Sequence, residues 1–335
     1  MAVSRQGPVE GAPLRSEERP VPEPGPREAL VRVSACGVCR TDLHIVEGDL
    51  PLRRAPIVPG HQVVGRVERV GPGAARFGVG ERVGIAWLRR TCGACEFCRS
   101  GRENLCEGSE FTGYHADGGY AEYAVVPEAF AYRIPPIFGD AEAAPLLCAG
   151  IIGYRALRLS GVPAGGRLGI YGFGASAHVT LQVARGRGCR VFVCTREPSH
   201  RALARELGAA WVGDIPDPMP EKMHGTIVFA PVGELVPLAL RNLARGGTVA
   251  LAGIYMTPVP QLDYARELFD ERVVRSVTAN TRADGEEMLA EAAGIPVRPA
   301  VTTFPLEAAN EALAALKRGA FSGAGVLLTG TTPGV

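Results

Sequence analysis

Four cysteines with the spacing of metal ligands stand close together in the sequence: Cys92, Cys95, Cys98 and Cys106. Thiolates spaced in this way can converge on one tetrahedral zinc ion, with Zn–S bonds of about 2.3 Å. Four protein ligands leave no open position, so we predict a structural zinc site that holds a long loop together. An iron–sulfur cluster is one alternative, because such clusters are also held by four cysteines; four unligated thiols are the other.

A second group of potential ligands is spread along the chain. Cys39, His61 and Cys148 are distant in sequence, and none of them is specific on its own. A lone histidine at the start of a strand is more often structural than a ligand. Two cysteines and one histidine with a free fourth position are, however, a ligand set of catalytic zinc. We therefore interpret these three residues as a candidate open metal site.

A glycine-rich turn follows a predicted strand over 167–171 and opens a predicted helix over 175–185. It contains Gly172, Gly174 and Ala177 in the pattern G-x-G-x-x-A. The first glycine permits a tight turn, the second lets a pyrophosphate approach the backbone, and the small third residue lets the helix pack closely on the strand. The helix amino terminus favours the phosphate charge. The turn predicts dinucleotide binding, and an ordinary strand–helix turn is the alternative.

The next strand, predicted over 190–194, bears on the choice of dinucleotide. NAD-binding domains carry an acidic residue about 20 residues after the turn. Thr195 occupies that place here and is followed by Arg196. An arginine beside a hydroxyl suits the 2′-phosphate of NADP, so we predict NADP in preference to NAD. NAD remains the alternative, because Glu197 follows and Arg196 could be an ordinary surface residue.

The elements that must position these groups change in character after Cys148. Many short strands with glycine and proline between them, among them strands expected over 59–70 and 118–126, predict a β-rich domain at 1–150. Strands that alternate with helices over 151–294 predict a parallel sheet with right-handed crossovers. Residues 295–335 contain a strand, a helix over 306–317 and a strand over 325–328, and we expect this tail to return to the first domain.

Length and composition exclude several classes of protein. The 335 residues suffice for two domains, and 36 Lys and Arg against 35 Asp and Glu give a net charge of +1. This balance argues against a nucleic-acid partner held by a basic face. No apolar run of about 18 residues predicts a membrane span, and the first residues lack the apolar core of a signal peptide. With cysteines better suited to metal binding than to disulfides, we expect a cytoplasmic protein.

Together, these segments resemble the zinc-dependent medium-chain alcohol dehydrogenases of the medium-chain dehydrogenase/reductase superfamily. They occur in the family's order and span nearly the whole chain. The matching segments are 36–44, 59–65, the cysteine quartet at 92–106, 147–150 and the glycine-rich turn. The resemblance implies an α/β fold, with a GroES-like β-rich catalytic domain and a Rossmann domain built on a doubly wound parallel sheet.

The resemblance also implies roles for individual residues. Cys39, His61 and Cys148 resemble the ligands of the catalytic zinc, which with the quartet makes two zinc ions per chain. Thr41 resembles the residue that hydrogen-bonds the substrate oxygen. His44 resembles the relay residue beside the nicotinamide ribose.

Two further positions lie beside the implied zinc. Asp42 resembles the acid that orients the ligand histidine, a partner that zinc-bound histidines commonly need. Gln62 stands where the family usually has a glutamate close to the zinc. Because Gln62 is neutral, we expect a less negative site with altered ligand exchange at the metal and with metal binding retained.

The implied activity is reversible hydride transfer between a primary or secondary alcohol and the corresponding aldehyde or ketone, with NADP or NAD as cofactor. Trp87 and Leu50 are candidates for the wall of the substrate pocket, with ordinary packing as the alternative. Polyol dehydrogenases, aldehyde reductases and zinc-free quinone or enone reductases of the same fold are alternative functions, as is a catalytically silent binding or scaffold protein. We expect a small-molecule substrate, no membrane partner, and a homodimer or homotetramer.

Overall fold

The computed structural model describes residues 1–215, 217–295 and 297–330, which form two compact units. The first unit contains Met1–Cys148, Ala279–Ala293 and the segment from Pro299 onward, and the second contains Ala149–Thr278 and Gly294–Arg298. The predicted domain limits placed residues 151–294 together. Residues 279–293 instead pack with the first unit, where Gly285 lies against the ring of Tyr132.

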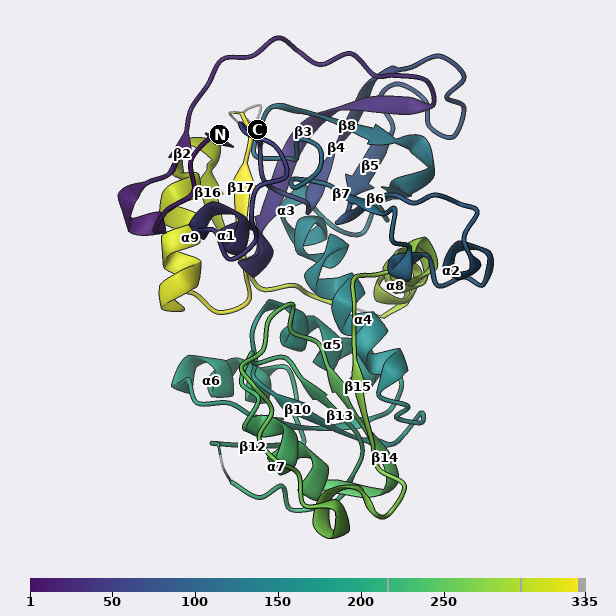
Figure 1. Cartoon of the computed structure of the whole chain (residues 1–335), viewed down its shortest axis with the longest axis vertical. Helices are drawn as coiled ribbons and strands as arrows, with labels where there is room; N and C mark the ends of the chain where they lie inside the picture. The colour runs from purple at the N-terminus through teal and green to yellow at the C-terminus, as the bar shows by residue number, and fades with distance from the viewer. Residues whose placement is uncertain (216, 296, 331–335) are drawn as a thin grey trace. The chain divides into compact units, whose positions relative to one another are not determined.

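A seven-stranded sheet forms the centre of the first unit, in the order β16-β17-β3-β4-β5-β9 with β8 also paired to β3 (Figure 1). The long strand β3 pairs antiparallel with β4, β8 and β17, and Leu327 of β17 lies opposite Cys36 of β3. The tail of the chain therefore completes the sheet that its first long strand begins. The strands are β3 (Glu28–Val38), β4 (Val63–Val70), β5 (Arg82–Ile85), β8 (Tyr123–Pro127), β9 (Ala131–Arg133), β16 (Val301–Pro305) and β17 (Ala324–Leu328).

Short elements surround this sheet. Two small antiparallel pairs join β1 (Ala2–Val3) to β2 (Leu14–Arg15) and β6 (Leu88–Arg90) to β7 (Glu110–Phe111). The helices of the unit are α1 (Arg40–Glu47), α2 (Glu96–Arg99), α3 (Asp140–Ala143), α8 (Arg282–Gly294) and α9 (Ala309–Arg318). Among the helices that the structure describes, none combines the length and the apolar composition needed to cross a membrane.

The second unit is a six-stranded sheet in the order β12-β11-β10-β13-β14-β15, and all of its pairings are parallel. Buried parallel strands read as continuous apolar runs, and β10 and β11 begin and end where the sequence predicted. The strand order reverses beside β10, as in doubly wound folds. The elements are α4 (Ala149–Leu159), β10 (Arg167–Tyr171), α5 (Ala175–Gly186), β11 (Arg190–Cys194), α6 (Pro198–Glu206), β12 (Trp211–Gly213), β13 (Met223–Val228), α7 (Leu235–Arg241), β14 (Leu243–Leu251) and β15 (Val273–Ser276). The predicted α/β fold class is confirmed.

Two of the predicted strands are shorter than expected. The strand predicted over 59–70 begins only at Val63, and the one predicted over 118–126 begins at Tyr123. Gly60 has φ +96°, a left-handed conformation that does not continue a strand. Helices α1, α4 and α8 were not predicted, and the helix expected over 306–317 starts with a 3₁₀ turn before α9.

Candidate functional site

Three distant segments of the first unit bring Cys39, His61 and Cys148 together. Cys39 ends the link between β3 and α1, His61 precedes β4, and Cys148 follows the 3₁₀ turn Ala144–Leu147. The two sulfurs lie 3.9 Å apart, His61 Nε2 lies 3.3 Å from Cys148 Sγ, and all three donor atoms lie within 4.8 Å of one another. Sulfur ligands of a tetrahedral zinc with bonds of about 2.3 Å are roughly 3.8 Å apart. The donor set therefore fits one zinc ion with a fourth position left over.

The buried carboxylate of Asp42 orients this donor set. Asp42 Oδ1 accepts hydrogen bonds from His61 Nδ1 at 3.0 Å and from the Gly60 amide at 3.1 Å. Asp42 Oδ2 accepts from the Cys39 amide at 2.9 Å and from Tyr120 Oη at 3.2 Å. Because His61 donates through Nδ1, its Nε2 is left to carry the lone pair that a metal needs. Asp42 also forms the capping box of α1 with Cys39, which fixes where the helix starts.

The electrostatics of the three donors favour a thiolate. The hydrogen bond from Cys148 is the largest influence on Cys39 and, with His61, outweighs burial and holds the pKa of Cys39 well below its usual range. Burial alone would lower the pKa of His61, but the charges of Asp42 and Cys39 reverse this effect and raise it to about 10. A divalent cation would replace the protons that these groups otherwise share.

Helix α1 carries the other predicted residues of this site. Thr41 is buried, with its hydroxyl oxygen 3.7 Å from Cys39 Sγ. His44 lies one turn further along, with its side chain 20% exposed and its Nδ1 2.7 Å from Asp49 Oδ2. A hydroxyl beside the candidate metal ligands and a partly exposed imidazole on the same helix are suited to moving a proton between a buried site and water.

An aromatic stack lies against His61. The rings of Trp87 and His61 meet edge to face with centroids 4.9 Å apart, and Trp87 stacks on Phe111 at 4.8 Å and on Tyr114 at 6.0 Å. Leu50 packs against the same hydrophobic core. Trp87 is thus held rigidly beside a metal-site residue, as a wall of a substrate pocket would need.

Gln62 is buried immediately after His61. Its side chain covers Gly37, where a Cβ atom would come within 2.8 Å of Gln62 Cδ. The backbone of Gly37 also donates to the Gln62 carbonyl at 2.9 Å. The neutral amide therefore packs against β3, and any larger residue in place of Gly37 would have to displace it.

The four cysteines of the quartet also converge. The donor atoms of Cys92, Cys95, Cys98 and Cys106 lie within 4.8 Å of one another. Backbone amides of Ala94 and Cys95 donate to Cys92 Sγ, and these bonds lower the pKa of Cys92 to about 6. The short helix α2 inside this loop buries none of its residues. A loop with four thiols at its centre and little apolar core fits a closed, structural metal site.

A charged clamp holds the quartet loop to the rest of its unit. Glu103 lies within the loop and is buried, and Arg282 at the start of α8 donates to both of its carboxylate oxygens at 2.6–3.1 Å. The Arg282 amide adds a bond at 2.8 Å, and its guanidinium stacks over Phe130. Burial opposes but does not outweigh these bonds, which keep the pKa of Glu103 lowered. Sequence reasoning missed this clamp, because the two residues are far apart along the chain.

In the second unit, the glycine-rich turn has the geometry that its residue types predicted. Gly172 has φ +85°, and a Cβ atom there would lie 2.9 Å from the amide nitrogen of Ala230. Gly174 precedes α5, and a Cβ atom there would meet open space. Ala177 is fully buried, so the helix packs closely on the sheet. The turn thus leaves open space at the amino terminus of α5, where a phosphate binds favourably.

Thr195 and Arg196 follow the carboxyl end of β11. Thr195 is buried and Arg196 is exposed. Arg201 donates to the Thr195 carbonyl at 3.1 Å and pairs at 2.9 Å with Asp214, which follows β12. The Ile215 amide, Arg201 and Arg196 lower the pKa of Asp214. Asp214 is an acidic residue near this strand end that the sequence pattern after β11 does not reveal, because it follows the neighbouring strand β12.

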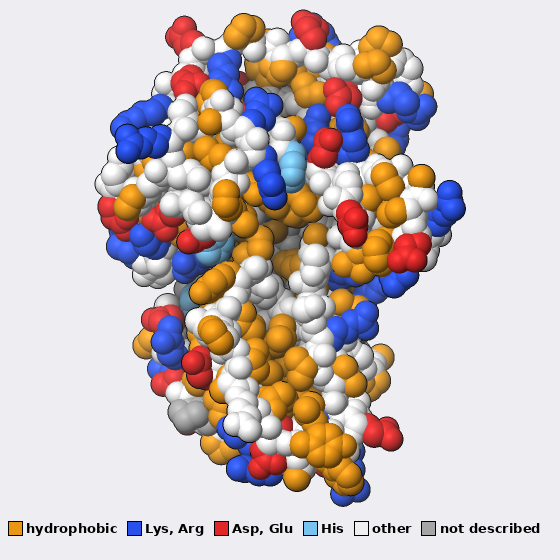
Figure 2. Space-filling model, in the orientation of Figure 1, with side chains coloured by type: hydrophobic (Ala, Val, Ile, Leu, Met, Phe, Trp, Pro, Cys, Tyr) orange, Lys and Arg blue, Asp and Glu red, His pale blue; other side chains and the backbone are white. Residues whose placement is uncertain are grey.

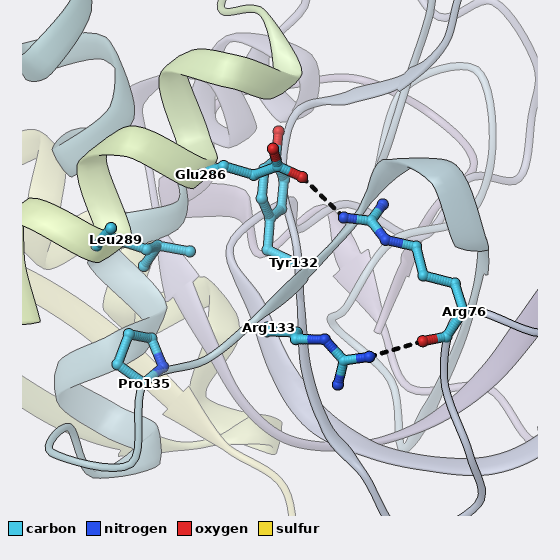
Figure 3. Close-up of a pocket in the computed structure, with 7 residues that line it drawn as sticks. Arg76, Tyr132, Arg133, Pro135, Glu286 and Leu289 are labelled. Carbon is cyan, nitrogen blue, oxygen red and sulfur yellow. Dashed lines mark hydrogen bonds and ion pairs between the residues drawn. The ribbon is translucent and has the colours of Figure 1, made fainter.

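A separate cavity of about 280 Å³ lies within the first unit (Figure 3). Its charged side chains are paired, Arg76 with Glu286 at 2.8 Å and Arg133 with Glu81 at 2.9 Å. Tyr132 lines the cavity from the side of β9. The cavity therefore lies where α8 packs beside the sheet, and its lining charges are already neutralised by these ion pairs.

Comparison with known proteins places this site in context. Residues 25–136 match the model of the alcohol dehydrogenase GroES-like domain, and residues 177–294 match that of the zinc-binding dehydrogenases. A probable alcohol dehydrogenase, AdhA, of Mycobacterium tuberculosis is 53% identical over 97% of this chain and 96% of its own. An alcohol dehydrogenase of Geobacillus stearothermophilus is 37% identical over 94% of this chain and 96% of its own. Among solved structures, a cinnamyl alcohol dehydrogenase of Sorghum bicolor superposes with a TM-score of 0.88 at 28% identity, covering 97% and 96% of the two chains.

Proposed function

The chain belongs to the zinc-type medium-chain dehydrogenase/reductase family, whose alcohol dehydrogenases it matches over nearly its whole length, and we propose that it is a zinc-dependent, NADP-preferring member of them. The reaction is reversible hydride transfer between an alcohol and its aldehyde or ketone. The observation that carries this proposal is the meeting of Cys39, His61 and Cys148 within 4.8 Å, beside Thr41.

In this proposal, the chain binds two groups that the reaction needs, a zinc ion and a nicotinamide dinucleotide, and its own side chains move the substrate proton. Cys39, His61 and Cys148 would hold a zinc ion, which would supply Lewis acidity toward the substrate oxygen, and the glycine-rich turn would hold a nicotinamide dinucleotide, which would supply the hydride chemistry. Thr41 would accept the proton of the substrate hydroxyl while it releases its own hydroxyl proton toward His44 and water, so the threonine stays neutral. The buried position of Thr41 and the partial exposure of His44 support this direction of transfer.

Metal analysis with matched variants tests the proposal. The purified protein should contain two zinc ions per chain, one in each donor group. Cys39→Ser should lose one of them together with alcohol oxidation. Cys36→Ala should keep both, because Cys36 is a buried thiol near the end of β3, three residues before Cys39 and outside both donor groups. A protein that reduces quinones or enones equally well after Cys39→Ser would instead be a zinc-free reductase. Zinc bound at the quartet alone, with no hydride transfer, would indicate a scaffold protein.

The preference for NADP rests on Thr195 and the exposed Arg196. A charge-assisted hydrogen bond to the 2′-phosphate contributes about 1.5–3 kcal/mol, so Arg196→Ala should reduce the ratio of NADPH to NADH turnover by about 10-fold or more. Arg190→Ala is the matched control, because Arg190 is an exposed arginine at the amino end of β11, the strand that Arg196 follows, and pairs with Glu221. An unchanged ratio in Arg196→Ala would refute this assignment.

The aromatic stack supports a flat, apolar substrate. Trp87 is backed by Phe111 and Tyr114 and touches His61, so an aromatic alcohol can lie against a rigid ring. The Sorghum relative is named for cinnamyl alcohol, which has that shape. Trp87→Ala should raise the KM for cinnamyl alcohol by about 10-fold and leave that for ethanol nearly unchanged; an equal effect on both would refute the role. A polyol dehydrogenase would instead prefer sorbitol in the same assay.

The free edge of the second unit supports a homodimer or a homotetramer built on it. All four residues of edge strand β15 are exposed, including Val273 and Val274. Figure 2 shows hydrophobic side chains gathered on this unit, and exposed large apolar residues precede β15 at Ile254, Tyr255, Val259, Tyr264 and Phe269. An exposed apolar edge strand is a template for pairing with a second chain. Val274→Lys should yield monomers in sedimentation, and an unchanged mass would refute this interface.

A reducing compartment suits this chemistry, and we expect the protein in the cytoplasm. All nine cysteines are free thiols, and metal ligands must remain reduced to bind zinc. Cell fractionation against a cytoplasmic marker tests this expectation.

A further inference from the structure

The Gly-Gly-Tyr segment at 118–120 is tied to the residues just before His61. The Gly118 amide donates to the Val58 carbonyl at 2.7 Å, the Gly119 amide to Gly60 at 2.9 Å, and the Tyr120 amide to Pro59 at 3.0 Å. Three consecutive bonds therefore hold the two segments in register, although neither segment is part of a strand.

The ring of Tyr120 fills the space that Gly60 leaves open. A Cβ atom at Gly60 would lie 2.4 Å from Tyr120 Cδ1 and 2.8 Å from Cys36 Sγ, and Gly60 has φ +96°. Tyr120 is fully buried. Since a buried ring in a closed space has few rotamers, the direction of its hydroxyl is fixed.

That hydroxyl completes the hydrogen bonding of Asp42. Of the four donors to this carboxylate, two are backbone amides and one is His61 itself. Tyr120 Oη, at 3.2 Å from Oδ2, is the other side-chain donor. Burial is the largest cause that raises the pKa of Tyr120, so the phenol keeps its proton and donates it. Asp42 is completely buried, and each of its oxygens is used twice.

We propose that Tyr120 is a positioning residue for the metal-binding histidine and acts through Asp42. By fixing the plane of the carboxylate, it fixes the direction in which His61 Nδ1 must donate and therefore the direction in which Nε2 faces the metal. The inference rests on the proposed zinc site. Outer partners of zinc ligands commonly change metal affinity by about 10–100-fold, and Tyr120 is one step further from the metal, so an effect near the lower value is expected.

Tyr120→Phe tests the proposal, because it removes the hydroxyl and keeps the ring. Tyr132→Phe is the matched control. Tyr132 is also a buried tyrosine of the first unit, and its hydroxyl has no hydrogen-bond partner among the described residues. It lines the cavity of Figure 3 and belongs to neither donor group.

The measurement is zinc transfer from the intact protein to a chromogenic chelator, with total zinc per chain determined beforehand. Tyr120→Phe should release one of the two zinc ions at about 10-fold lower chelator concentration, while the other zinc and the wild-type fold by circular dichroism are retained. Tyr132→Phe should release zinc as the wild type does. In an Asp42→Asn background, Tyr120→Phe should add little further effect, because two residues that act as one unit are not additive.

The outcomes separate this proposal from the proposed function. Wild-type zinc release by Tyr120→Phe, or equal weakening by Tyr132→Phe, overturns the role of Tyr120 and leaves the metal site in place. A full additional effect in the Asp42→Asn background also overturns it, because Tyr120 would not then act through the carboxylate. A wild-type protein that binds only the quartet zinc overturns both.

Discussion

His178 is expected to make the second unit sensitive to acid. It lies in the first turn of α5, directly after Ala177 of the glycine-rich turn, and is fully buried. Burial lowers its pKa from 6.5 to about 4, outweighing hydrogen bonds to the backbone of Gly174 and Ala175. The folded unit therefore holds a neutral imidazole where the unfolded chain would hold a charged one in mild acid.

The sign and size of the effect follow from these two pKa values. Above pH 6.5 the imidazole is neutral in both the folded and the unfolded chain, so the free energy of unfolding has its full value there. Below pH 6.5 the unfolded chain binds a proton that the folded chain refuses until about pH 4, so stability is lost as the pH falls. Between pH 7 and pH 5 the loss is about 2 kcal/mol, or a roughly 20-fold rise in the opening equilibrium.

Hydrogen–deuterium exchange of the amides in β10 and α5, corrected for intrinsic rates, measures this opening at each pH. His178→Gln keeps a hydrogen-bond donor and does not titrate. Between pH 7 and pH 5, the protection of these amides should therefore fall by a factor about 20 times smaller in the variant than in the wild type. Equal acid dependence in the two proteins would show that His178 is not the titrating group.

The quartet, its clamp and the glycine-rich turn give three more tests. Cys98→Ser should remove one zinc per chain and open the loop to trypsin, as metal analysis and limited digestion measure; an intact loop without zinc would contradict its structural role. Arg282→Leu should strip the buried Glu103 carboxylate of its partner and cost about 1–3 kcal/mol in urea unfolding, and an unchanged midpoint would refute the clamp. Gly172→Ala, which forces a Cβ atom to within 2.9 Å of the Ala230 amide, should weaken NADPH binding at least about 10-fold in a fluorescence titration while both zinc ions remain; unchanged affinity would contradict the proposed turn.

The parts of the fold that the sequence predicted best are those set by local pattern. Buried parallel strands such as β10 and β11 are short apolar runs between charged or glycine residues, so their limits can be read directly. The quartet and the glycine-rich turn are also local, and their geometry agrees with their spacing. The family and the fold class followed from these motifs and are confirmed.

The parts that could not be predicted depend on contacts between distant residues. Tyr120 lies in a segment with the alternation of a strand, and nothing near it in sequence points to Asp42. The Glu103–Arg282 clamp joins residues 179 positions apart. For the same reason, the sequence pattern did not indicate that residues 279–293 pack with the first unit. Such pairings are fixed by tertiary packing, which local propensity does not contain.

The position of β17 has a consequence for how the protein is made. β3 is finished once Val38 is synthesised, but its neighbour β17 begins at Ala324. At about 5–20 residues per second, the ribosome needs roughly 15–60 s to cover that interval. The inserted unit can fold on the ribosome in the meantime, whereas the sheet that positions Cys39 must wait for the tail. The unit whose synthesis starts first is therefore completed last, and its free thiols have to stay reduced until then.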